Sequence, residues 1–133
     1  MFYDFSLPVP ANTSYNNRLV EPISLTHGII HRVEIDFPAG CEGSVHLKIR
    51  HGLHQLWPTN PQGSFSTNDY VIAFNDYYPY LRRPYLLTLV AWNLDPKNQH
   101  TLAIRFGVLP QEVLMPEASF TAAFKKLMSR LRL

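Results

Sequence analysis

The chain has 133 residues, of which 46% are hydrophobic and 17% charged, and its formal net charge is +2. This length suits one domain that buries a sizeable core, and the single cysteine, Cys41, excludes an internal disulfide. The sequence shows neither the pattern of a signal peptide nor the ~18 consecutive apolar residues of a membrane span, so we expect neither signal-peptide secretion nor a transmembrane segment.

Two strand candidates come first in the chain, at residues 2–9 and 18–25. Each contains a proline, Pro8 in the first and Pro22 in the second. Proline has no N–H to donate to a neighbouring strand, so both segments suit the edges of a sheet rather than its centre.

Two longer runs with strand character follow at residues 29–37 and 44–51. In the first run, apolar side chains alternate with Arg32, Glu34 and Asp36, and the second run alternates in the same way. A period of two is typical of antiparallel strands that bury one face.

A turn rich in Gly and Pro separates these two runs, and we expect them to pair as a hairpin because consecutive strands are usually neighbours. Matching the apolar faces of the runs would place Glu34 opposite Lys48 and Asp36 opposite His46. The alternative is that the two runs belong to different sheets.

Further strand candidates alternate with turns as far as residue 108. Residues 53–57 read as a continuation of the second run after a bulge at Gly52. Residues 86–92 are apolar on both faces, as expected of a central strand that is covered on both sides. Two more segments alternate, at residues 70–74 and 102–108.

These segments amount to about seven or eight short strands without a helix between them. The pattern predicts an all-β, antiparallel β-sandwich domain over residues 1–110. We favour a jelly-roll-like arrangement, because the Cys…Trp…Cys core of immunoglobulin domains is absent.

Residues 111–133 are predicted to form a linker and a basic amphipathic C-terminal α-helix. Residues 117–133 hold four basic side chains and one acidic, a net of +3, whereas residues 1–116 hold eight basic and nine acidic, a net of −1. We expect the helix to dock on another subunit; packing on its own domain and contact with nucleic acid or a membrane are the alternatives. The candidate contact residues are Phe120, Phe124, Lys125, Lys126, Leu127 and Leu131.

Residues 75–84 read as a long connection rich in Tyr and Arg, the residue types that most often carry binding energy at interfaces. The alternative is a loop whose tyrosines fold over one end of the sandwich. The candidate interface residues here are Tyr77, Tyr78, Tyr80, Arg82 and Arg83.

No arrangement of side chains in the sequence points to catalysis. His51 and His54 are three residues apart, but no carboxylate or cysteine nearby completes a metal-ligand set. The sequence also contains no phosphate-binding Gly loop and no nucleophile elbow. We therefore expect no enzyme activity, assign no catalytic, metal or cofactor-binding residues, and expect no small-molecule substrate.

Three segments resemble those of small β-sandwich structural proteins from phage and virus particles: residues 7–13 (LPVPANT), residues 27–58 with their two alternating runs, and residues 106–110 (FGVLP). This resemblance implies a jelly-roll-like subunit of a capsid or tail that forms homo-oligomers and contacts other virion structural proteins. It also implies synthesis in a host cytoplasm and localisation in the virion.

Two other functions remain open from the sequence. A carbohydrate-binding or receptor-binding module would expose aromatic side chains such as Trp57, Tyr77 or Trp92. A cupin-like metal enzyme would use His51 and His54 as ligands.

Overall fold

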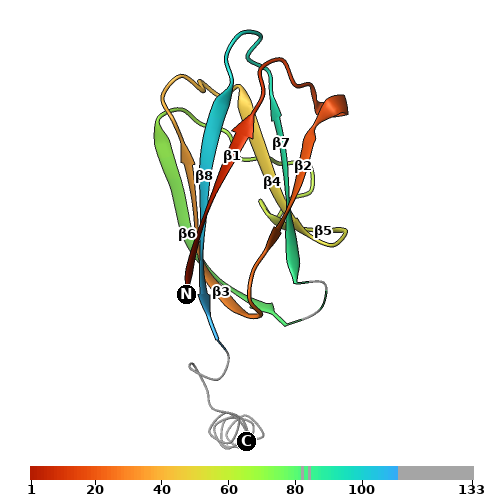
Figure 1. The fold of residues 1–133 in the computed structure, drawn as a ribbon, viewed down its shortest axis with the longest axis vertical. Coiled ribbons are helices and arrows are strands. Elements are labelled where there is room, and N and C mark those ends of the chain that lie inside the picture. The colour runs from red at the N-terminus through yellow and green to blue at the C-terminus, as the bar shows by residue number, and fades with distance from the viewer. Residues whose placement is uncertain (82, 84, 111–133) are drawn as a thin grey trace, which may run out of the picture.

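The computed structural model describes residues 1–81, 83 and 85–110, and in these residues the chain forms two antiparallel sheets that face each other (Figure 1). No helix in this described part is long and apolar enough to cross a membrane. The predicted linker and C-terminal helix, residues 111–133, lie outside the described residues. The elements are β1 (Phe2–Val9), a 3-10 turn η1 (Tyr15–Asn17), β2 (Leu19–Ser24), β3 (Gly28–Phe37), β4 (Val45–His51), β5 (His54–Trp57), β6 (Tyr70–Tyr80), β7 (Leu86–Asn93) and β8 (His100–Leu109).

The strand order is β1-β8-β3-β6 in the first sheet and β2-β7-β4-β5 in the second. The predicted all-β antiparallel sandwich of about seven or eight strands is confirmed. β1 with Pro8 and β2 with Pro22 lie at sheet edges as predicted, because a proline cannot complete a ladder on both sides. β7, apolar on both faces, is an interior strand between β2 and β4.

The predicted hairpin between residues 29–37 and 44–51 is wrong, because β3 belongs to the first sheet and β4 to the second. Glu34 lies opposite Arg105 of β8, and Lys48 lies opposite Val90 of β7. Each run has one apolar face, and that face is buried equally well whether the runs pair edge to edge or face each other from two sheets. The hydrophobic pattern alone therefore could not choose between the two arrangements.

An ionic network takes the place of the predicted cross-strand pairs on the outer face of the first sheet. Arg105 lies 3.8 Å from Asp4, 3.7 Å from Glu34 and 3.8 Å from Asp36. Arg32 donates to Glu34 at 3.2 Å. The polar face predicted for the first run is thus real, but its partners come from β1, β8 and, through the Arg32–Asn75 hydrogen bond, β6.

The core lies between the two sheets and contains the inward-facing side chains of both. Its central members, such as Ile35, Leu47 and Ile104, are fully buried. Cys41 is also fully buried, and this burial raises the pKa of its thiol, so the thiol stays protonated at neutral pH.

Two boundaries differ from the sequence prediction. Gly52 is not a bulge but part of a tight turn, with φ +62, so β4 and β5 form a hairpin with His51 opposite His54. β6 continues to Tyr80, so most of the predicted connection at residues 75–84 is strand.

Candidate interaction site

The two sheets meet along one side of the sandwich, where β5 ends the second sheet and β6 ends the first. Two hydrogen bonds join the sheets here. The indole N–H of Trp57 donates to the Asp76 carboxylate at 2.6 Å, and the Tyr78 hydroxyl shares a 2.6 Å hydrogen bond with Nδ1 of His51. We call this side, formed by β5, β6 and the end of β4, the β5–β6 side.

Aromatic rings fill the space beneath these hydrogen bonds. The ring centroid of Trp57 lies 6.0 Å from that of Phe74 and 6.0 Å from that of Tyr78. Phe65, from the loop before β6, lies 5.9 Å from Phe74. The inner face of β6 is therefore fixed by packing within the chain, and it is the outer face and the free edge of this strand that remain available.

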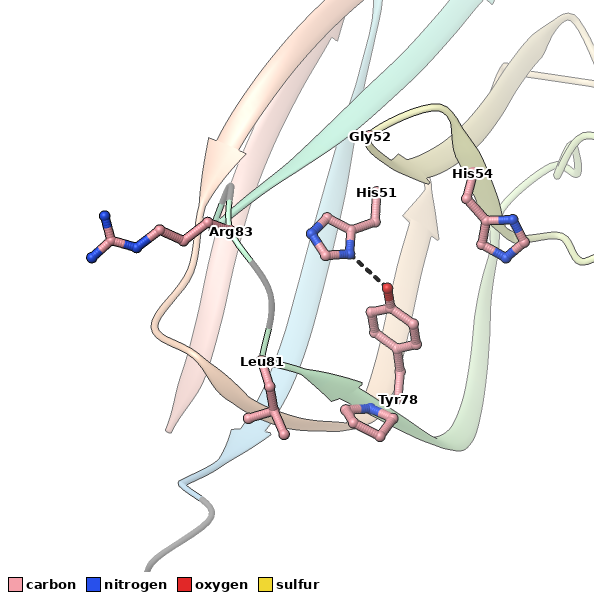
Figure 2. A pocket seen from close by; sticks show the side chains of 7 residues that line it. His51, Gly52, His54, Tyr78, Leu81 and Arg83 are labelled. Carbon is pink, nitrogen blue, oxygen red and sulfur yellow. Dashed lines mark hydrogen bonds between the residues drawn. The ribbon is translucent and has the colours of Figure 1, made fainter.

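A pocket of about 590 Å³ lies at one end of the β5–β6 side. Its described lining contains two imidazoles, one phenol and one guanidinium, and no carboxylate. Figure 2 shows His51 and Tyr78 meeting at its centre, His54 to one side, and the side chain of Arg83 extending away from the pair. The lining residues are His51, Gly52, His54, Tyr78, Pro79, Leu81 and Arg83.

The described lining of the pocket contains no set of side chains that could hold a metal ion. Among the described residues, no three His, Cys, Asp or Glu side chains lie close enough to hold one metal ion. His51 and His54 face each other across the β4–β5 hairpin, but no third ligand joins them in the described part of the chain. The geometry therefore offers no support for the cupin-like alternative.

The tyrosines predicted as interface residues separate into inner and outer positions, because strand β6 directs alternate side chains to opposite faces. Tyr77 points outward and is 66% exposed. Tyr78 is half-buried and bonded to His51, and Tyr80 is fully buried, which raises the pKa of Tyr80 to about 12. Tyr80 is therefore part of the core and cannot contact a partner while the sandwich is folded.

Of the predicted arginine and tail contact residues, the structure describes Arg83 alone. Arg83 lines the pocket, with its guanidinium carbon 5.8 Å from the ring centroid of Tyr85. The others lie outside the described residues: Arg82, Phe120, Phe124, Lys125, Lys126, Leu127 and Leu131.

The first half of β6, residues 70–75, is a candidate surface that was not predicted from the sequence. β6 pairs with β3 on one side and is the last strand of its sheet on the other. Figure 1 shows it along the free margin of the sandwich. Tyr70 is 63% exposed and Val71 is 40% exposed. The signal was present in the sequence as an uncharged run of strand-forming residues, YVIAFN, but an edge cannot be recognised until the strand order is known.

The two tryptophans do not provide exposed faces. Trp57 is 4% exposed, and Trp92 is 8% exposed although it lies on the outer face of the second sheet. His46 stacks on Trp92 at 5.1 Å and Tyr15 of η1 meets it edge-on at 4.9 Å. Burial of the His46 imidazole against Trp92 lowers its pKa.

Comparisons with known proteins identified no relative of this chain. No protein-family model, no curated protein and no solved structure matches the chain.

Proposed function

We propose that this chain is a structural subunit of a virus or phage particle, either a capsid decoration or minor capsid component or a tail accessory subunit, which acts through protein–protein contacts. The observation that carries this proposal is the strand order. β1 pairs with β8, β2 with β7, β3 with β6, and β4 with β5. These four pairs are those of one long antiparallel ribbon folded over on itself, which supports the jelly-roll-like arrangement predicted from the sequence.

A jelly-roll-like fold is compatible with several functions and does not by itself decide between them. Viral capsid proteins, lectins and cupins all use this fold, so fold alone is an argument by analogy. The surface supports the capsid class: residues 70–75 of β6 present an uncharged, partly apolar strand edge, which suits contact with protein better than contact with a polar ligand.

The carbohydrate-binding alternative has one observation in its favour. Tyr77 is exposed and lies on β6, next to the half-buried Tyr78 that lines the pocket. Sugar-binding sites usually stack their ligand on broad aromatic faces, and both tryptophans are buried. We therefore rank this alternative second.

The proposed partners are further copies of this chain and other structural proteins of the particle, and the proposed location is the virion. We propose that the basic residues 117–133 provide an additional contact with a neighbouring subunit. Contact of this segment with nucleic acid or a membrane is the less favoured role, since in the helix predicted from the sequence its apolar positions would form a single narrow stripe suited to a protein groove.

The test is the mass of the purified full chain in solution, measured by light scattering over a hundredfold range of concentration, with a glycan array run on the same sample. We expect a defined oligomer and no glycan binding. A chain that stays monomeric at every concentration would overturn the proposal, and binding of a defined glycan by that monomer would favour the binding module.

A further inference from the structure

We propose that two copies of this chain join by antiparallel pairing of β6 with β6, so that the first sheets of the two copies become one continuous sheet. The proposal concerns the free edge of β6, where one row of backbone N–H and C=O groups has no neighbouring strand among the described residues. It rests on the proposed assembly function and specifies the surface and the partner.

The first half of β6 has the composition of a self-pairing strand. Residues 70–75, YVIAFN, contain no charged residue, no proline and no glycine, and five of the six are aromatic, β-branched or aliphatic. Tyr70, Val71 and Ala73 are exposed. Proteins usually protect an edge of this kind with charges, proline or a covering segment. Residues 70–75 contain no charge and no proline, and no strand of the described chain lies beside this edge.

The other three sheet edges in the described chain are protected. β1 carries Asp4 and Pro8, and β2 carries Glu21 and Pro22. β5 is only four residues long and is followed directly by Pro58. The β6 edge of one copy therefore finds a matching, unprotected edge only at β6 of the other copy. Pairing of identical edges gives a two-fold symmetric contact that closes on itself.

The geometry of β6 also limits the length and register of the pairing. Asp69 has φ +47 and lies outside the extended strand. At the other end, the register passes from Arg32↔Asn75 to Ile30↔Tyr78, so Asp76 and Tyr77 form a bulge opposite β3. The regular edge thus runs over residues 70–75, between two carboxylates that discourage further extension.

A two-fold axis at Ala73 uses this regular segment and needs no residue before Tyr70. It places Ala73 opposite its own counterpart, Val71 opposite Asn75, and Ile72 opposite Phe74. No charged side chain then faces a like charge, and the smallest side chain of the segment lies at the axis.

The test compares the full chain with two variants by light scattering over a range of concentration. Ala73→Lys places two like charges opposite each other at the proposed axis. Ser6→Lys makes the same charge change at an exposed position on β1, the opposite edge of the same sheet. We expect Ala73→Lys to weaken dimer formation roughly tenfold or more, and Ser6→Lys to leave it unchanged.

Three outcomes decide between the two proposals. Equal association of both variants would overturn β6 pairing while leaving the assembly function intact. A full chain that is monomeric throughout would overturn both. If Ala73→Lys fails to fold, hydrogen exchange of the unmodified chain decides: amides of residues 70–75 that become protected as concentration rises support the pairing, and exchange independent of concentration overturns it.

Discussion

The indole N–H of Trp57 donates to the Asp76 carboxylate at 2.6 Å, and this bond joins the last strand of one sheet to the last strand of the other. Trp57 is 4% exposed, so water cannot easily replace its acceptor. Asp76 also accepts the backbone N–H of Tyr77 at 2.7 Å, which fixes the carboxylate at the bulge of β6. The pair therefore determines how β6 lies against the second sheet.

Removing the acceptor should destabilise the sandwich. We expect Asp76→Ala to lower the free energy of unfolding by about 1–3 kcal/mol, because it leaves the buried Trp57 N–H without a partner. Asp76→Asn keeps an acceptor oxygen and should lose less. Urea unfolding followed by tryptophan fluorescence provides the measurement.

A double-mutant cycle separates this bond from other effects of the substitution. In a Trp57→Phe background no indole N–H remains, so Asp76→Ala should cost less than it does in the unmodified chain. An equal cost in both backgrounds would show that Asp76 stabilises the chain in some way other than through Trp57.

The turn before β8 should make stability depend on acid pH. The backbone N–H of Lys97 and the side chain of His100 hold the pKa of Asp95 down at about 2. An unfolded Asp has a pKa of about 3.9, so protonation favours the unfolded chain. The stabilisation is thus complete above about pH 4 and is lost as the pH falls toward about 2.

The comparison with Asp95→Asn isolates this group from the other carboxylates. The variant should be less stable than the unmodified chain at pH 5, and the difference should shrink between pH 4 and pH 2. Denaturant unfolding at each pH gives the two curves, and a difference that does not change with pH would contradict the account.

Two glycines lie where the chain passes close to its neighbours. A Cβ at Gly28 would lie 2.6 Å from the carbonyl oxygen of Leu109, and a Cβ at Gly107 would lie 2.8 Å from Nε2 of His31. Backbone cannot move aside as a side chain can, so Gly28→Ala should lower the free energy of unfolding more than Gly107→Ala does. For Gly107→Ala we expect a loss of about 1–3 kcal/mol.

Thermal unfolding of the two variants tests this order. Replacing His31 by alanine should recover part of the loss in Gly107→Ala and none of the loss in Gly28→Ala. Recovery in both variants, or in neither, would contradict the contacts assigned to these positions.

Deleting residues 117–133 should leave the sandwich folded, because all of its described core residues lie between Leu7 and Val108. We expect an unchanged melting temperature, retention of the β6 dimer and loss of larger assemblies. Light scattering and thermal unfolding on the same sample provide the check. A truncated chain that assembles like the full one would remove the proposed role of this segment.

Local sequence patterns were enough to predict the sandwich, the edge positions of β1 and β2, and the interior position of β7. Each of these depends on a local property: Pro8 and Pro22 lack an N–H, and residues 86–92 are apolar on both faces. The pattern could not decide which strands share a sheet, so the pairing of Glu34 with Lys48 was wrong.

The candidate site was harder to predict because it depends on strand order. Pro79 and the neighbouring tyrosines made residues 75–80 look like a loop rather than a strand, so Tyr80 was taken for a surface residue although it faces the core. Continuing the alternation of Ile72 and Phe74 through Tyr78 would have identified its inward direction. The free edge at residues 70–75 is a property of the whole sheet, and no local pattern contains it.

The β6 contact can be tested most directly by oxidative cross-linking of an Ala73→Cys chain in dilute solution. Opposite residues of an antiparallel pair have Cα atoms about 4.5–5.5 Å apart, within reach of a disulfide, whereas two copies of Val71→Cys would be offset by about 14 Å. The native Cys41 is 0% exposed and should not compete. We predict rapid formation of a covalent dimer by Ala73→Cys and none by Val71→Cys; equal cross-linking of the two variants, or none by either, would contradict the account.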